Sequence, residues 1–402
     1  MRKNILNIVM SFIMSVVLLF PLITYAEEPL HVSFHETKQT EIKLLDPDQR
    51  FKRYTFSSGY DFSYPDAVRG IYVTGPSVGG EQFQSLLNLV DNTDLNAMVI
   101  DIKDDFGYLT FTPEKDSPFK NIGSNYIKDP EQLMKTLEEK EIYPIARIVV
   151  FKDTYLAKKR PDLSFLDGEK VWVNRREEAF VNPYEKEVWE YNIEIAKLAA
   201  EMGFKEIQFD YVRFPEGFET RDELLKYSLG DYKNSEKDSV QRRVDAVTDF
   251  VQHAKKELAY YDVDVSVDIF GYAATIPETP GIGQNFSKIS ENVDVISSMI
   301  YPSHWGNNFF GIPVPDKEPY RLVSEYAKVE NNVLAKLKNP PISRPWIQDF
   351  SATWLYNGSK PFYYGKEEVE AQIKALKENG INEFLLWNAA NTYTKNVNYL
   401  VK

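Results

Sequence analysis

Three aspartates stand where apolar stretches of this 402-residue sequence end or are interrupted. Asp101 lies in "MVIDIKD", Asp210 in "IQFDYV" and Asp268 in "VDVSVDIF". A carboxyl group in such a position costs free energy unless it pairs with a cation or takes part in chemistry. Two carboxyl groups facing one bond are what hydrolysis of a glycosidic bond requires, one protonated and one charged. Whether these aspartates can act together depends on which way they face in the strands that carry them.

Alternation within these strands predicts which side chains point inward. In 97–103 the apolar set Met98, Ile100 and Ile102 faces outward, so the intervening positions face inward. The same reading of 143–151, 206–212 and 263–270 predicts a polar inward set: Asp101, Lys103, Arg147, Asp210 and Asp268. The alternative is structural, with Asp101–Lys103 or Asp210–Arg213 as ion pairs that seal the end of the fold.

Short β-branched runs alternate with stretches of helical period from residue 69 onward. This order predicts a (β/α)₈ TIM barrel spanning residues 67–395, whose active site would lie at the carboxyl ends of the strands. The predicted strands are 70–74, 97–103, 143–151, 206–212, 263–270, 293–301, 344–350 and 382–388. An open doubly wound sheet is the rival, but no glycine-rich phosphate loop follows the first strand.

Two helices have clear sequence signals. Apolar residues recur at spacings of three and four from Val240 to Leu258, which predicts one buried helix face. Asn182 followed by Pro183 predicts the N-cap and first residue of another helix. The connection 271–292 is short on helix.

Composition narrows the classes of partner and chemistry. The formal net charge of −13 disfavours nucleic acid and anionic membranes, which need a basic face. The chain has no cysteine, which excludes disulfides and cysteine nucleophiles. We expect no cofactor and no metal, because hydrolytic metal sites usually need two histidines and only His304 stands at a strand end. A Mg²⁺ or Ca²⁺ site of Asp101, Asp104 and Asp210 stays open as an alternative.

The amino-terminal residues predict export. Arg2 and Lys3 precede an apolar run that ends in Thr24-Tyr25-Ala26, the order of a secretory signal peptide over residues 1–26. The run is also long enough to stay as an uncleaved anchor, the one case in which a membrane is a partner. Residues 27–66 are predicted to be a polar leader segment. No protein partner is evident.

Five blocks carry a resemblance over residues 68–395. They are "GIYVTG", "VIDIKDDFG", "FDYVRFPEG", "SVDIFGY" and "MIYPSHW". They resemble the recurring blocks of a family of bacterial exported proteins classed as glycoside hydrolases, which is itself similar to the barrel of the α-amylase-like retaining glycosidases. The resemblance implies a hydrolase that cleaves a cell-wall or extracellular polysaccharide.

The same resemblance implies the roles of the carboxyl groups. Asp210, at the end of the fourth strand, takes the place of the nucleophile, and Asp268, at the end of the fifth, that of the acid/base. The α-amylase-like acid is usually a glutamate, one methylene longer, so Glu216 in the following loop is an alternative acid. Arg147 or Arg213 would hold Asp210 in its charged form.

Aromatic residues at strand ends are candidates for sugar contacts. Tyr301, His304 and Trp305 lie in "IYPSHWG", and Trp387 ends the eighth strand. The alternative is that these rings belong to the core. For the whole protein, the alternative functions are an inactive barrel that binds wall polysaccharide or a protein partner, and a metal-dependent polysaccharide hydrolase or deacetylase.

Overall fold

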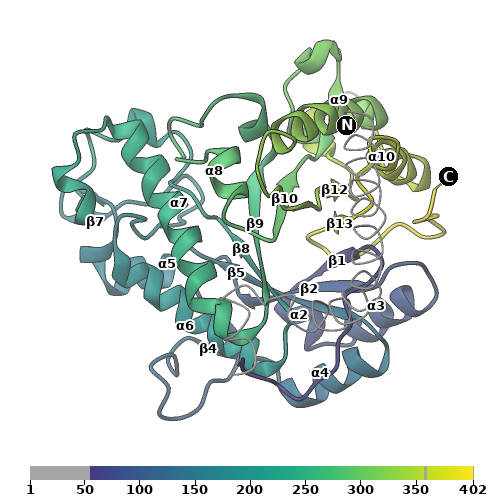
Figure 1. Cartoon of the computed structure of the whole chain (residues 1–402), viewed down its shortest axis with the longest axis horizontal. Helices are drawn as coiled ribbons and strands as arrows, with labels where there is room; N and C mark the ends of the chain where they lie inside the picture. Colours follow the sequence, from purple (N-terminus) through teal and green to yellow (C-terminus); the bar gives the residue numbers. More distant parts are fainter. Residues whose placement is uncertain (1–54, 357–359, 402) are drawn as a thin grey trace, which may run out of the picture. The chain divides into compact units, whose positions relative to one another are not determined.

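In the computed structural model, which describes residues 55–356 and 360–401, eight parallel strands close into a ring (Figure 1). Closure occurs at β1 (Arg69–Val73), which pairs with both β2 (Ala97–Lys103) and β13 (Phe384–Trp387). The strands between them are β5 (Tyr143–Val149), β8 (Glu206–Asp210), β9 (Asp264–Phe270), β10 (Val295–Met299) and β12 (Trp346–Gln348). Each overlaps one predicted strand, so the TIM barrel is confirmed.

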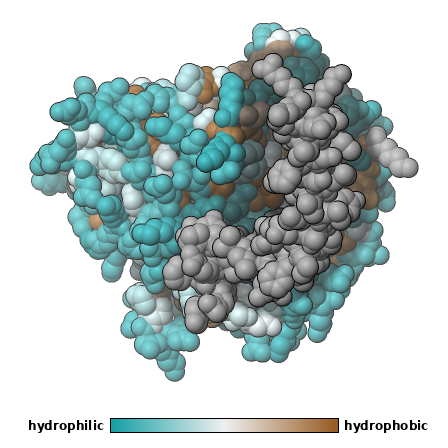
Figure 2. All heavy atoms as spheres, viewed as in Figure 1, coloured by the Kyte–Doolittle hydropathy of each residue, from teal (hydrophilic) through white to brown (hydrophobic). Residues whose placement is uncertain are grey.

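Helices surround the ring, as Figure 1 shows. The longer ones are α3 (Gln82–Asp91), α4 (Pro130–Glu139), α6 (Lys186–Met202), α7 (Ser239–Leu258), α9 (Pro319–Leu334) and α10 (Lys366–Glu378). Only the five-residue α8 (Phe286–Ser290) and a short 3₁₀ turn lie between β9 and β10, where the sequence is short on helix. The predicted apolar face of α7 is buried, including Val244, Val247 and Val251. The face visible in Figure 2 is mostly hydrophilic where its atoms are coloured.

Short elements elaborate the connections at the carboxyl ends of the strands. After β2, strand β3 (Leu109–Phe111) pairs antiparallel with β2, and β4 (Gly123–Ile127) pairs with β3. The helices α2 (Gly75–Val78) and α5 (Thr154–Lys159) and the hairpin of β6 (Leu166–Asp167) with β7 (Lys170–Val171) also follow strand ends, whereas β11 (Ile342–Ser343) pairs with the first residues of β10 at the amino-terminal end. None of these short elements is predicted from the sequence.

The predicted start of α6 is wrong by one turn. Asn182 does not cap the helix, because its side chain accepts the backbone N–H of Tyr184 and donates to the carbonyl of Ser228. The helix begins at Lys186 instead, with Glu185 as its N-cap. Asn182 thus favours a local turn over a cap, as asparagine side chains often do.

Two apolar layers pack on the two faces of the barrel wall. Met98, Ile100 and Ile102 belong to the layer between sheet and helices, while Val99 belongs to the cluster inside the barrel, so the predicted alternation of β2 holds for these residues. The inner cluster consists of Val68, Tyr72, Ala97, Val99, Tyr143, Ile145, Tyr301, Trp346 and Leu385. This cluster forms the apolar part of the barrel interior, which also contains the buried Gln208 at the middle of β8, whose amide donates to Ser297 at 3.3 Å.

An ion cluster closes the amino-terminal end of the barrel. Arg344 is fully buried and donates to Glu206 at 2.7 and 2.8 Å, to Glu383 at 2.7 Å and to the hydroxyl of Tyr64 at 2.8 Å. Tyr64 belongs to the predicted leader, in which Phe56 and Asp61 also contact the barrel through their backbone N–H groups, to the carbonyl of Tyr260 and the carboxylate of Glu138. The earlier leader residues and the predicted signal segment lie outside the described ranges.

Removing Arg344 is expected to destabilise the barrel. An Arg344→Met variant leaves Glu206 and Glu383 buried without their cation, and breaking a buried ion pair costs about 3–5 kcal/mol. Arg321→Met is the matched control, because Arg321 is half-exposed and its pair with Glu318 is worth at most about 1 kcal/mol. Urea denaturation of both variants at pH 7 measures the difference. Equal stability of the two variants would contradict a structural role for Arg344.

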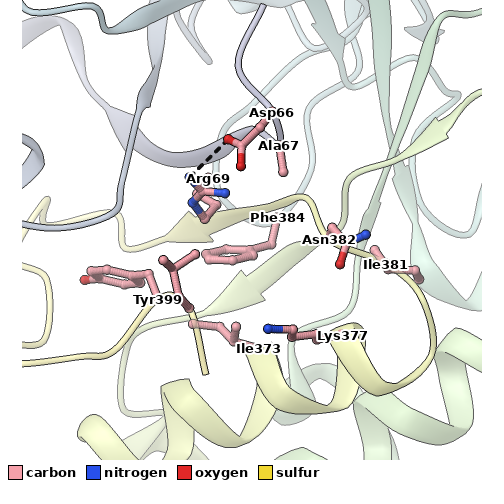
Figure 3. Close-up of a pocket in the computed structure, with 10 residues that line it drawn as sticks. Asp66, Ala67, Arg69, Ile373, Lys377, Ile381, Asn382, Phe384 and Tyr399 are labelled. Atoms are coloured by element: carbon pink, nitrogen blue, oxygen red, sulfur yellow. Dashed lines mark hydrogen bonds and ion pairs between the residues drawn. The ribbon is translucent and has the colours of Figure 1, made fainter. Parts of the chain in front are cut away.

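The same end of the barrel holds a pocket of about 270 Å³ (Figure 3). Its lining includes Arg69 and Phe384, the first residues of β1 and β13, with Lys377 near the end of α10. Because barrel enzymes place their chemistry at the carboxyl ends of the strands, this pocket lies at the wrong end to be the active site. Within the described ranges, no helix is long and apolar enough to cross a membrane.

Candidate active site

Arg147 joins three carboxyl groups at the carboxyl-terminal end of the barrel. From β5, its guanidinium donates to Oδ2 of Asp210 at 2.6 and 2.9 Å, to Oδ1 of Asp101 at 2.7 Å and to Oδ1 of Asp105 at 3.0 Å. The strand register explains the meeting, because Asp101 pairs with Arg147 across β2 and β5, and Val149 pairs with Asp210 across β5 and β8. Three of the predicted inward residues are thus in direct contact.

Asp210 is held at both oxygens. Arg147 occupies Oδ2, and Oδ1 accepts the backbone N–H of Tyr211 at 2.6 Å. Tyr211 has φ of 53°, a left-handed conformation that costs a tyrosine on the order of 1 kcal/mol. The turn ends β8 and fixes the orientation of the carboxyl group. The two hydrogen bonds from the guanidinium are charge-assisted, which makes them the strong contacts of this carboxyl group.

Asp268 has the opposite environment. It is 1% exposed, forms no ion pair with any residue that the structure describes, and accepts a hydrogen bond at 2.7 Å from the indole N–H of Trp346. Burial and then the charge of Asp210 raise the pKa of Asp268 well above its usual range, and the Trp346 hydrogen bond opposes them only in part. Phe209 pairs with Val267, so Asp210 and Asp268 each follow one residue later on neighbouring strands. The two carboxyl groups therefore differ in environment, because Asp210 bonds to a guanidinium and Asp268 to a neutral indole.

Asp101 is a third carboxyl group of the site, and its environment also changes its pKa. Burial raises its pKa to about 6, and the Arg147 cation limits that rise. Its Oδ2 accepts the hydroxyl of Tyr72 at 2.6 Å. Asp101 contacts Asp210 only through Arg147, which makes it a positioning residue for that guanidinium.

Lys103 does not line the site, and its predicted inward orientation is wrong. Its amine lies 2.7 Å from a carboxyl oxygen of Asp153 and 3.0 Å from Oδ1 of Asn192 on α6, on the helix side of the wall. The pairing of β2 with β5 shifts register between Asp101 and Lys103. Such an irregularity adds a residue to one strand and reverses the side that later side chains face. The Asp101–Lys103 pair therefore does not form.

Arg213 and Glu216 form a separate pair beside the site. The buried Arg213 lies 4.7 Å from the ring centres of both Tyr211 and Phe270 and donates to Glu216 at 3.1 Å. The structure thus assigns the cation of Asp210 to Arg147, and the alternative pair Asp210–Arg213 is absent from the described residues. The side chain of Glu216 is 71% exposed on the loop after β8.

The predicted aromatic contacts divide into two groups. Trp387 stacks on Tyr72 at 4.2 Å and lies beside Arg147 and Tyr301, inside the barrel mouth. The exposed ring of His304 lies 5.2 Å from Tyr301. Trp305 instead packs on Phe309, Phe310 and Tyr326 of α9, so the core interpretation is correct for this ring.

Four contributors to the site are missed by the sequence reading: Tyr72, Asp105, Lys152 and Trp346. Asp105 bonds to both Arg147 and Lys152, and these two cations lower its pKa against the effect of burial. Alternation in β1 and β12 would have found Tyr72 and Trp346. Asp105 and Lys152 lie in loops just after strand ends, where no periodic pattern predicts which way a side chain points.

The described residues contain no group of three or more histidine, aspartate or glutamate side chains placed to hold a metal ion. The sequence left open a Mg²⁺ or Ca²⁺ site formed by Asp101, Asp104 and Asp210. In the structure, Asp101 and Asp210 form ion pairs with Arg147. Asp104 accepts the backbone N–H groups of Phe106 and Tyr108. These three carboxyl groups thus have protein donors as partners.

Comparison with known proteins agrees with this geometry. The family model described as "Putative glycosyl hydrolase domain" matches residues 70–393. The chain belongs to this family. No curated protein matches it. The glycoside hydrolase domain of PgaB (BpsB) from Bordetella bronchiseptica has a similar structure, with 14% identity and a TM-score of 0.54 over 81% of this chain and 95% of that one.

Two further solved structures are similar. A hypothetical protein from Ruminiclostridium thermocellum is 32% identical, with a TM-score of 0.42 over 49% of this chain and 96% of its own. The spore cortex-lytic enzyme SleL of Bacillus cereus is 11% identical, with a TM-score of 0.47 over 81% of this chain and 72% of its own. The family match shows that the chain has a glycosyl hydrolase domain, which the strand topology places on a TIM barrel, and this domain implies a carbohydrate substrate.

Proposed function

We propose that this protein is an exported glycoside hydrolase that cleaves a cell-wall or extracellular polysaccharide with Asp210 and Asp268 as its two carboxyl groups. The observation that carries the proposal is their asymmetry. Arg147 forms an ion pair with Asp210, while burial and the neighbouring Asp210 raise the pKa of Asp268 well above its usual range. A pair of carboxyl groups whose environments separate their charge states matches the acid and nucleophile of a glycosidase.

The proposed reaction proceeds in two steps. Asp268 donates its proton to the glycosidic oxygen as that bond breaks, and an oxygen of Asp210 bonds to the anomeric carbon. Water then attacks that carbon and gives a proton to Asp268, and the bond between the carbon and Asp210 breaks. This retaining course needs carboxyl groups about 5–5.5 Å apart. Adjacent strand ends in register favour that spacing over the wider one of inverting enzymes.

Arg147 has two tasks in this mechanism. It balances the charge of Asp210 before attack, and it fixes which oxygen of Asp210 faces the sugar. Asp101 and Asp105 hold the guanidinium in place, and the rings of Tyr72 and Trp387 lie 5.4 and 5.5 Å from it. Oδ2 of Asp210 already accepts two hydrogen bonds from Arg147, whereas Oδ1 accepts only the backbone N–H of Tyr211, so Oδ1 keeps a lone pair for attack.

Activity against polysaccharides tests the proposal. Purified protein is incubated with peptidoglycan, exopolysaccharides and α-glucans, and released products are read by mass spectrometry, with Asp210→Asn in parallel. We expect oligosaccharides from the parent protein only. Binding of a polysaccharide without release of any product would instead support the inactive barrel.

The pH profile should depend on Trp346. Its N–H stabilises the anionic form of Asp268 and so lowers the pKa of the acid. Trp346→Phe removes that donor, so the pKa of Asp268 rises further and Asp268 stays protonated to higher pH. The basic limb of kcat/KM should therefore move to higher pH. A limb that stays in place or moves down would contradict Asp268 as the acid.

Export is the remaining part of the proposal. It rests on the signal-peptide pattern of residues 1–26 and places the enzyme where wall and extracellular polysaccharides are found. Amino-terminal sequencing of the secreted protein should give Glu27 as the first residue. A chain that begins at Met1 in the membrane fraction would show an uncleaved anchor.

A further inference from the structure

A row of aromatic rings leads from the carboxyl groups to solvent. Trp387, beside Arg147, lies 6.3 Å from Tyr301 between ring centres. Tyr301 lies 5.9 Å from Phe350, and Phe350 stacks on Trp354 at 6.0 Å with an interplanar angle of 17°. The row thus continues from the strand ends into the loop after β12, and only its inner members belong to the site described above.

The outermost ring of the row is open to solvent. Trp354 is 59% exposed, although Phe350 stacks against it, whereas Tyr301 is buried. An exposed indole leaves a large apolar area in water, and such an area at the edge of a site commonly marks a binding surface.

The short turn that carries Trp354 is anchored by a hydrogen bond to the barrel. Trp354 lies in a 3₁₀ turn (Thr353–Tyr356), and Tyr356 donates to Oδ2 of the buried Asp316 at 2.7 Å. Gln348 of β12 donates to Oδ1 of Asp316 at 3.2 Å, and Tyr364 donates to its carbonyl at 3.0 Å. A ring on an anchored turn is preorganised, so a ligand that stacks on it loses little free energy to ordering the loop.

We propose that Trp354 forms an outer sugar-binding subsite and that the substrate is a polysaccharide chain that runs along the row, rather than a small glycoside. This inference rests on the proposed function and extends it to substrate length. The C–H faces of a pyranose ring stack on an indole while the hydroxyl groups stay in water, and the row connects such a stacked sugar to the cleavage site. A protein partner would lack that continuity with the carboxyl groups.

Binding by Trp354→Ala tests the inference in the Asp210→Asn background, where substrate is not consumed. The probes are soluble starch and hydroxyethyl cellulose in affinity electrophoresis and insoluble peptidoglycan in sedimentation. The control is Tyr260→Ala, which removes an equally exposed ring from the turn (Ala259–Tyr261) that precedes the amino end of β9. Against the probe that the Asp210→Asn protein binds, Trp354→Ala should lose about tenfold or more in affinity. Tyr260→Ala should stay within about twofold.

The outcomes separate the two proposals. If Trp354→Ala loses polysaccharide binding while the parent protein hydrolyses nothing, the subsite stands and the hydrolase proposal fails. If the parent hydrolyses a polysaccharide and Trp354→Ala binds it like its background, the subsite is refuted. Binding to none of the three probes also refutes it. On an active parent, Trp354→Ala should lose at least about ten times more kcat/KM on the polysaccharide than on an aryl glycoside.

Discussion

Replacing Asp210 with asparagine is expected to lower turnover about 10⁴-fold on any substrate that the protein cleaves. The amide keeps the shape of the side chain but cannot form the bond to the anomeric carbon. Polysaccharide binding should survive, because Arg147 keeps Asp101 and Asp105 as partners. Steady-state kinetics give the loss, and thermal denaturation confirms that the variant is folded.

The matched control for Asp210→Asn is Asp264→Asn. Asp264 lies at the first position of β9, and burial raises its pKa to about 6, but it lies at the amino end of the strand, away from the site. Its replacement should leave turnover nearly unchanged. Near-full activity of Asp210→Asn on a proven substrate would remove Asp210 from the mechanism.

Asp268→Asn should produce a loss that depends on the leaving group. General acid catalysis contributes about 10²–10⁴-fold, so cleavage of an unactivated sugar linkage should fall by that amount. An aryl glycoside with an activated leaving group scarcely needs a proton, so formation of the glycosyl intermediate from it should change little. Rates across a series of leaving groups measure this dependence.

Glu216→Gln distinguishes the two candidate acids. Glu216 is exposed and pairs with Arg213, so its replacement should leave the leaving-group dependence as it is in the parent protein. A silent Asp268→Asn together with an impaired Glu216→Gln would transfer the acid role to Glu216.

The barrel was predictable because its strands follow the period of two and its helices the period of 3.6. Val99 and Met98 face opposite sides of the wall as alternation requires. The same rule failed at Lys103, because the register shift after Asp101 depends on how two strands pair, which is a tertiary property. Strand-end aspartates were therefore easier to place than the residue two positions later.

The electrostatic pattern of the site was only partly predictable. Arg147 was a candidate partner for Asp210 because both were expected to face inward from neighbouring strands. Asp105 and Lys152, which complete the network, are contributed by loops whose paths no local pattern determines. Trp305 is the opposite case, a residue that was a candidate for the site but does not belong to it. Its ring follows the sixth strand, yet it packs toward α9 and the core.

The most direct test of the account is to trap the glycosyl intermediate. Asp268→Asn is incubated with an activated aryl glycoside of the sugar that the parent protein releases, and the intact protein and its peptides are weighed by mass spectrometry. Without the base that assists water, the intermediate should accumulate. We expect one added glycosyl unit on the peptide that contains Asp210. No adduct, together with a parent product of inverted anomeric configuration, would contradict the covalent role of Asp210.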